Sequence, residues 1–122
     1  MGAWRRAAAL ATEPPPPGRI CLIHRDYHPA NTLWQDGRLT GVVDWTQASI
    51  GPAAVDVAHM RWNLALDHGL AAAARFLELV GRGSDQSYWD VVTVLDVLPE
   101  LPAAAVGELE RYVATCFPQR HA

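Results

Sequence analysis

Apolar and polar positions along the chain divide it into a strand-forming part followed by a helical part. A short apolar run at 20–23, with turn residues beyond it, is typical of a buried strand. Strand-like runs at 32–35 and 38–43 flank Asp36-Gly37, a dipeptide that supplies the positive φ angles of a type I′ turn. The sequence therefore predicts one β-hairpin, preceded by a loop at 24–31.

The hydrophobic period becomes helical from residue 53 onward, and glycine or proline marks the end of each helix. Four helices are expected, at about 53–68, 71–80, 88–98 and 102–116. Residues 84–87 offer capping side chains for the third of them. Because the strands come first and the helices follow, the predicted fold class is α+β rather than alternating βαβ units.

Residues 1–18 are interpreted as a proline-rich leader or linker outside the packed domain. The four consecutive prolines at 14–17 lack amide donors and favour polyproline II. Any helix at about 3–11 is expected to be short and frayed. The domain then spans 19–122, with the loop and hairpin at 19–45 and the helical part at 53–117.

The composition is that of one soluble globular domain: 122 residues, of which 50% are hydrophobic and 19% charged. A net charge of −3 leaves no basic excess for a phosphate backbone, so we expect no nucleic-acid partner. No run approaches the ~20 apolar residues of a membrane helix, so no membrane association is expected. All ten basic residues are arginine. A mechanism that requires a lysine is therefore incomplete within these residues.

Two features favour a cytoplasmic location. Cys21 and Cys116 are the two cysteines, and both lie in apolar stretches far apart in the chain, which is typical of reduced, buried thiols. The apolar stretch after Arg5-Arg6 is shorter than the ~7–15 residues of a signal peptide, and prolines follow it at once.

Candidate chemistry is concentrated in the loop at 24–31 and at the end of the hairpin. Asp26 directly follows a predicted strand, Asn31 begins the hairpin and Asp44 ends it. Because the two ends of a hairpin are adjacent, Asn31 and Asp44 are expected side by side. Carboxylate and amide oxygens suit Mg²⁺, and Asp26 is placed to orient a hydroxyl and take its proton.

Each of these residues also has a structural interpretation. Asp26 could form an Asx turn, Asn31 could cap a turn, and Asp44 could be a solvated strand end. The acidic residues of the helical part, Asp67, Asp85 and Asp90, would favour a cationic substrate or would equally fit a solvated helix surface.

A zinc-dependent hydrolase is a competing class. His24, Asp26 and His28 occupy alternate positions and could chelate zinc, with His59 or His68 as further ligands. This alternative leaves Asn31 and Asp44 without a role. Otherwise His28 is interpreted as packing the loop, and the other two histidines as structural. Tightly bound zinc after purification would favour the hydrolase.

Four segments in this order form a longer pattern: His24-Arg25-Asp26-Tyr27-His28-Pro29-Ala30-Asn31, Gly41-Val42-Val43-Asp44-Trp45, Gly51-Pro52 and Asp56-Val57-Ala58. The pattern resembles the aminoglycoside phosphotransferase family, whose kinase-like members include choline, homoserine and other small-molecule kinases. Asp44-Trp45 stands where protein kinases have Asp-Phe-Gly, which favours the small-molecule branch. The resemblance covers about 19–68 and implies a protein-kinase-like C-terminal lobe.

The resemblance implies a role for each matching residue. Asp26 would be the catalytic base that faces the hydroxyl of the acceptor. Asn31 and Asp44 would hold Mg²⁺ against the phosphates of ATP or another nucleoside triphosphate. The implied reaction transfers the γ-phosphoryl group to a small-molecule hydroxyl.

Three further residues would support the loop. The resemblance implies that His24 is a scaffold and that Asp56 accepts hydrogen bonds from the loop backbone. Arg25 departs from the glycine common at its position in the family, although arginine is the residue that protein kinases use there.

The N-terminal lobe of such enzymes supplies a glycine-rich cover, a lysine for the phosphates and a helix glutamate. Only 18 residues precede the predicted domain at 19–122, and no lysine is present. We therefore expect a C-terminal lobe without its N-terminal lobe: a truncated product, a misplaced start, half of a split kinase, or a non-catalytic pseudoenzyme or interaction module. Self-association, or binding of a separate N-lobe chain, is expected through apolar surface around Ile20, Leu33 and Val42.

Overall fold

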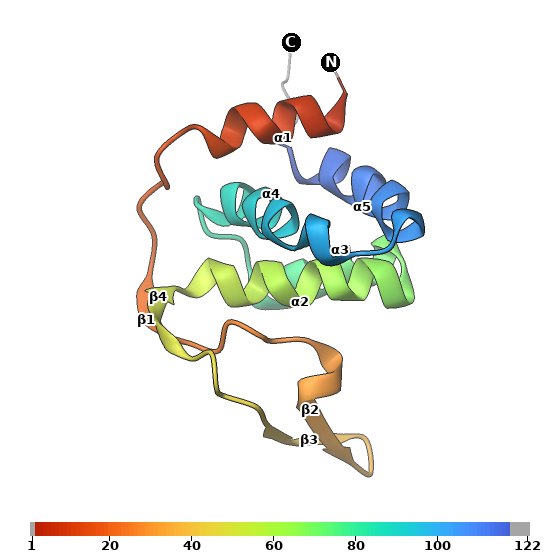
Figure 1. The fold of residues 1–122 in the computed structure, drawn as a ribbon. Helices are drawn as coiled ribbons and strands as arrows, with labels where there is room; N and C mark the ends of the chain where they lie inside the picture. The colour runs from red at the N-terminus through yellow and green to blue at the C-terminus, as the bar shows by residue number, and fades with distance from the viewer. Residues whose placement is uncertain (1, 118–122) are drawn as a thin grey trace.

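The computed structural model describes residues 2–117, which fold into a stack of helices with two small sheets at one end (Figure 1). The helices are α1 (Ala3–Ala11), α2 (Ala53–His68), α3 (Leu70–Val80), α4 (Gln86–Val97) and α5 (Ala103–Cys116). The strands are β1 (Ile20–Ile23), β2 (Thr32–Gln35), β3 (Arg38–Val42) and β4 (Ser49–Pro52), with single 3₁₀ turns η1 (Pro29–Asn31) and η2 (Leu98–Glu100). The strands and α1 lie on opposite sides of α2 (Figure 1).

The predicted α+β class is confirmed, and the four predicted helices correspond to α2–α5. Gly69 and Gly81 follow α2 and α3 with φ of 97° and 82°, conformations that residues with a side chain rarely adopt. The capping prediction is wrong for α4: Asp85 is its N-cap residue, and its side chain makes no capping hydrogen bond. No helix within 2–117 is long and apolar enough to cross a bilayer.

The hydrophobic core lies among the helices, with α2 packed against α3, α4 and α5. Its fully buried members include Val91 and Val94 of α4 and Leu109, Tyr112 and Val113 of α5. Cys116 is also buried here, and burial raises the pKa of its thiol to about 11. Neither Cys116 nor the half-buried Cys21 forms a disulfide.

The N-terminal helix is part of this core, so the prediction of a frayed helix outside the packed domain is wrong. α1 packs against α4 and α5, and Ala7 is completely buried. The Arg6 guanidinium also lies 4.1 Å from the centre of the Phe117 ring. An alanine-rich helix of 9 residues is marginal alone, and here tertiary packing stabilises it. The prolines after α1 form the connection to β1.

The apolar run at 20–23 forms the predicted strand, but it is not buried as expected. β1 pairs antiparallel with β4, with Leu22 opposite Ile50 and Ile23 opposite Ser49. Only Ile23 is buried, at 1% exposure, whereas Ile20 and Leu22 are 60% and 62% exposed. This two-stranded sheet has one covered face, so alternate side chains of the apolar run point outward.

The hairpin prediction is confirmed. β2 and β3 pair antiparallel, and Asp36 and Gly37 have φ of 51° and 76°, as a type I′ turn requires. β3 ends at Val42, one residue earlier than predicted. β4, by contrast, was not predicted, because its sequence Ser-Ile-Gly-Pro carries little strand signal.

A buried ion pair connects three of the helices. Arg61 of α2 pairs with Asp90 of α4, and its Nε–H donates to the carbonyl of Ala73 on α3 at 3.1 Å. Gln86 donates to the other Asp90 oxygen at 2.7 Å. Burial raises the pKa of Asp90, which is 0% exposed. Asp90 is therefore a core residue and neither a solvated acid nor a substrate ligand, and Asp85 is buried as well.

Candidate active site

The loop between β1 and β2 is held by α2 through one carboxylate. Asp56, in the first turn of α2, accepts hydrogen bonds from the backbone N–H groups of His24 at 2.7 Å and Arg25 at 2.9 Å. The start of a helix is electropositive, which favours a carboxylate there. This is the contact that the resemblance implies for Asp56.

The His24 ring connects the loop to the far end of the hairpin. Its Nε2 lies 2.7 Å from the carbonyl oxygen of Val43, and its Nδ1 accepts from the Asp26 backbone N–H at 3.0 Å. Because a carbonyl only accepts, Nε2 carries the proton. The ring is buried and packs 4.6 Å from the Trp45 ring. Both nitrogens are occupied, so His24 acts as a scaffold.

The zinc alternative is not supported by this geometry. His24 has no free nitrogen for a metal ion. Within the part of the chain that the structure describes, no three His, Cys, Asp or Glu side chains are placed to hold one.

Asp26 presents a partly solvated carboxylate in the middle of the loop. Its side chain is 38% exposed, and the amide of Asn31 donates to both its backbone carbonyl at 2.8 Å and its Oδ2 at 3.1 Å. The Nε2 of His28 lies 3.4 Å from the other carboxylate oxygen. The carboxylate is therefore oriented by its neighbours and still open to a hydroxyl group.

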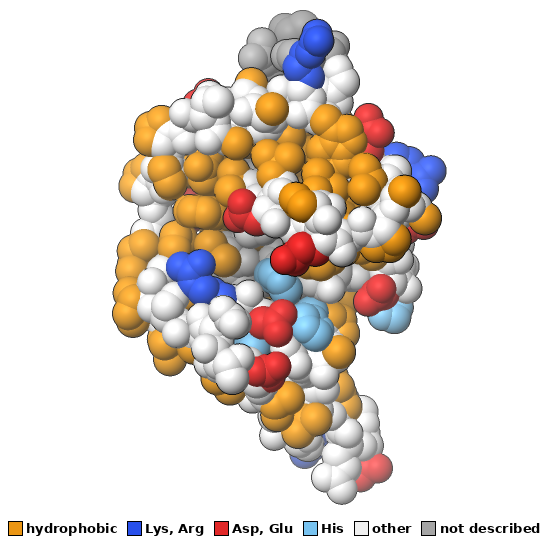
Figure 2. All heavy atoms as spheres, in the orientation of Figure 1, with side chains coloured by type: hydrophobic (Ala, Val, Ile, Leu, Met, Phe, Trp, Pro, Cys, Tyr) orange, Lys and Arg blue, Asp and Glu red, His pale blue; other side chains and the backbone are white. Residues whose placement is uncertain are grey.

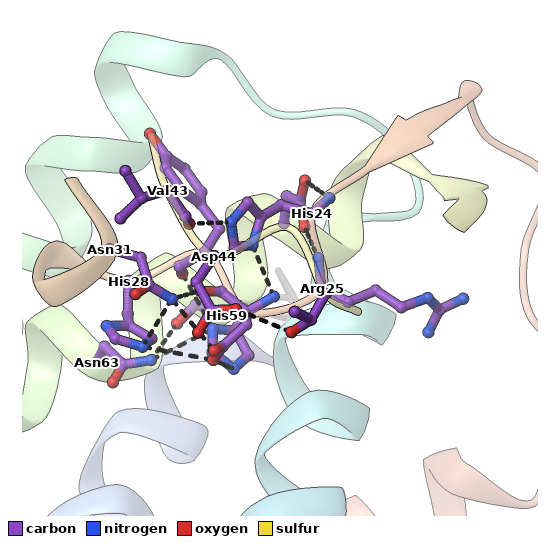
Figure 3. A network of polar contacts seen from close by, with 12 residues as sticks. His24, Arg25, His28, Asn31, Val43, Asp44, His59 and Asn63 are labelled. Atoms are coloured by element: carbon purple, nitrogen blue, oxygen red, sulfur yellow. Dashed lines mark hydrogen bonds and ion pairs between the residues drawn. The ribbon is translucent and has the colours of Figure 1, made fainter. Parts of the chain in front are cut away.

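Asn31 and Asp44 stand at the same end of the hairpin, as predicted. The backbone N–H of Val43 donates to the carbonyl of Asn31 at 2.9 Å, which places Asp44 next to this pair. Figure 3 shows both side chains in the same part of the site. The Asn31 amide nitrogen faces Asp26, and among residues 2–117 its Oδ1 makes no hydrogen bond. One Asp44 oxygen accepts from Thr46 at 2.8 Å. The free amide oxygen and the carboxylate are donors that fit Mg²⁺.

Arg25 and Asp44 both adopt left-handed backbone conformations, with φ of 71° and 59°. The strain at Arg25 gives a physical reason for the glycine that is common at this position in the family that the sequence resembles. The Nε–H of the Arg25 side chain donates to the Ser49 hydroxyl at 2.5 Å. Arg25 thereby connects the loop to β4.

His59 belongs to the site, although the sequence predicted a structural role for it or, in the zinc alternative, that of a further metal ligand. Its Nδ1 lies 3.0 Å from the carbonyl oxygen of Tyr27, and its Nε2 lies 4.0 Å from Asp26 Oδ1. Burial lowers the pKa of His59. The sequence feature that could have indicated this position is the spacing of His59 from Asp56, since residues three apart share one face of a helix.

A cavity of about 240 Å³ adjoins this site at His59 and Arg25. Its other lining residues come from α2, α4 and η2: Val55, Thr93, Asp96, Val97 and Glu100. A cavity of about 450 Å³ elsewhere is lined by residues such as Arg19 and Arg82, and no residue of the 24–31 loop contributes to it. The smaller cavity therefore borders the site through Arg25 and His59, and Asp26 itself does not line it. Figure 2 shows acidic side chains and histidines next to one another on the face that it draws.

The sequence matches the phosphotransferase enzyme family over residues 2–95, which is most of the chain. The chain belongs to the phosphotransferase enzyme family. The match begins before α1 and ends within α4, so it includes the loop, the hairpin, Asp56 and His59 as well as α1.

A curated relative shares part of this sequence. The uncharacterized protein YcbJ of Bacillus subtilis (strain 168) is 49% identical over 41 residues, which are 33% of this chain and 13% of that protein. The chain thus aligns with only a small part of that relative's length.

Proposed function

We propose that this chain carries the catalytic loop of an ATP-dependent phosphotransferase that transfers the γ-phosphoryl group to the hydroxyl of a small molecule. One observation carries the proposal: the partly solvated carboxylate of Asp26 is oriented by Asn31, which stands with Asp44 at one end of the hairpin. Membership of the phosphotransferase enzyme family supports it. A base beside two hard oxygen donors is the arrangement that phosphoryl transfer requires.

In this proposal Asp26 accepts a hydrogen bond from the acceptor hydroxyl and takes its proton as that oxygen attacks the γ-phosphorus. The bond from the γ-phosphorus to the β–γ bridging oxygen breaks, and ADP leaves with that oxygen. The Asn31 amide and the His28 ring hold the carboxylate in one orientation. Asn31 Oδ1 and the Asp44 carboxylate would hold Mg²⁺, which supplies charge neutralisation for the transferring phosphoryl group. His24, Arg25 and Asp56 keep the loop in place.

The nucleotide's remaining contacts are proposed to come from polypeptide outside these residues. The sequence contains no lysine to hold the phosphates. We assign the described fold to the C-terminal lobe of a kinase-like protein, with ATP shared between it and an N-terminal lobe, in the same chain of a longer protein or in a separate one. A cytoplasmic location is consistent with the two free cysteines.

The surface that would receive this lobe, or a second copy, is apolar. Ile20, Leu22 and Ile50 are exposed on the β1–β4 sheet, and Leu33 and Trp34 on the hairpin. Exposed apolar patches of this kind usually bind a partner. We therefore expect these 122 residues alone to self-associate and to transfer phosphate slowly or not at all. Light scattering during size exclusion tests the first expectation, and a monomer at all concentrations would contradict it.

The missing lysine also favours one alternative, a pseudoenzyme or interaction module that keeps the fold without turnover. A phosphate-transfer assay on the protein that contains this segment, against a panel of small-molecule hydroxyl acceptors, distinguishes the two. Asp26→Asn keeps the side-chain size but removes the base, and is expected to lower turnover about 10²–10⁴-fold. Asp67→Asn, at an exposed position on α2, is the matched control. Turnover within a few-fold of wild type in Asp26→Asn would show that Asp26 is not the base.

A further inference from the structure

We propose that His59 is a positioning residue for the base, and that its Nδ1–H fixes the Tyr27 carbonyl and so determines where the Asp26 carboxylate points. The inference deepens the proposed function and rests on it for the role of Asp26. It makes α2 the element that aligns the base on both sides.

The first argument is the tautomer of the His59 ring. Its Nδ1 lies 3.0 Å from the Tyr27 carbonyl oxygen, which can only accept a hydrogen bond. Nδ1 must therefore carry the proton in the neutral ring. The Asn63 amide lies 3.5 Å from the same nitrogen, a weaker contact, and donates instead to the His59 backbone carbonyl at 2.8 Å. The Asn63 amide therefore does not occupy His59 Nδ1, which donates to the Tyr27 carbonyl.

The second argument is what holds each backbone group around the base. The Asp26 N–H is held by His24, and the Asp26 carbonyl by Asn31. The next carbonyl, that of Tyr27, is held by His59. Asp56 and His59 lie three residues apart on α2, and they bind the loop backbone immediately before and immediately after Asp26. Without His59 the loop would be anchored to α2 on one side of the base only.

The third argument is that His59 does not act through a direct bond to the carboxylate. Its Nε2 lies 4.0 Å from Asp26 Oδ1, beyond hydrogen-bond distance. The ring is largely buried, and Trp62 packs against it edge-on at 5.2 Å. Burial lowers its pKa, against smaller opposing effects of the Tyr27 carbonyl, Asp26 and Asp56, and His28 lowers it further. The ring is thus a neutral, rigidly packed donor at neutral pH.

Two substitutions separate the two ring nitrogens. His59→Asn places an amide nitrogen close to the position of Nδ1, whereas His59→Gln places its amide close to the position of Nε2. In the complete protein, His59→Asn is expected to keep kcat within about 5-fold. His59→Gln is expected to lower kcat about 10–100-fold with little change in the KM for ATP, because misplacement of a reacting group by ~1 Å costs on the order of 10²-fold. His68→Gln, at the exposed end of α2, is the control.

Nuclear magnetic resonance of the ¹⁵N-labelled protein tests the contact without any turnover. The His59 ring is expected to be the Nδ1–H tautomer at pH 7. The Asp26 amide resonance and that of His28, whose N–H belongs to the same peptide group as the Tyr27 carbonyl, are expected to move in His59→Gln but to stay near wild type in His59→Asn. An Nε2–H tautomer, or equal loss of kcat in both variants, would overturn the inference. If the wild-type protein transfers no phosphate, the proposed function fails, and the tautomer still decides whether the contact exists.

Discussion

The Asp56 carboxylate lies 2.7 Å from the backbone nitrogen of His24, 32 residues earlier in the chain. The same carboxylate accepts a second hydrogen bond from the backbone of Arg25. A single acid on a packed helix therefore anchors a loop whose own residues are partly solvated. Because α2 is packed in the helical core, this contact restrains the backbone directly before the candidate base, Asp26.

Replacement of Asp56 tests how much the anchor contributes. In Asp56→Asn one neutral oxygen is left for two N–H donors, and the amide NH₂ faces one of them. Hydrogen bonds to charged groups contribute about 1.5–3 kcal/mol, so we expect the free energy of unfolding to fall by about that amount. Urea denaturation measures it, with Asp67→Asn as an exposed control. A loss no larger than the control's would mean that the loop is held by other contacts.

Alanine substitutions of the two candidate metal ligands are expected to have different effects on Mg·ATP binding and on kcat. Asp44→Ala removes a full negative charge and should weaken Mg·ATP binding more than Asn31→Ala, which removes a dipole. Asn31→Ala also frees the Asp26 carboxylate, because the Asn31 amide donates to it, so this variant should lose more kcat than metal affinity. Titration with Mg·ATP and steady-state kinetics of the complete protein separate the two effects. The reverse order of metal affinities would contradict the assignment.

The left-handed conformation of Arg25 predicts an unusual difference between two small substitutions. Both Arg25→Gly and Arg25→Ala lose the hydrogen bond to Ser49. Only glycine relieves the strain of φ 71°, which costs about 1–2 kcal/mol for a residue with a Cβ. Arg25→Gly should therefore be the more stable variant by about 1 kcal/mol in chemical denaturation. In a normal helix or strand the alanine variant would be the more stable of the two. Equal stabilities of Arg25→Gly and Arg25→Ala would therefore show that Arg25 is not strained.

The pair of Arg61 and Asp90 predicts a large loss of stability from a single truncation. Arg61→Met leaves the fully buried Asp90 without its partner, and removal of one member of a buried pair costs about 3–5 kcal/mol. The double variant Arg61→Met/Asp90→Leu should recover part of this loss. The exposed pair of Arg75 and Glu78 is the control, and Arg75→Met should cost less than about 1 kcal/mol. Thermal and urea unfolding measure both.

The sequence alone determined the features that depend on neighbouring residues. Asp36-Gly37 is sufficient for the hairpin turn, because both residues tolerate positive φ. Glycine and proline end the helices for equally local reasons. The spacing of Asp26, Asn31 and Asp44 also predicted that two of them would meet at one end of the hairpin, since strand pairing at that distance follows from the turn.

Contacts between residues far apart in the chain were decided by the tertiary structure. The pairing of β4 with β1, the packing of α1 and the burial of Asp90 each depend on surfaces that no local pattern describes. His59 is the clearest case in the site: it reaches the loop only because α2 packs there, so that its ring meets a carbonyl 32 residues away. Local conformational preferences determine the elements, whereas burial of their shared apolar faces determines which side chains surround the base.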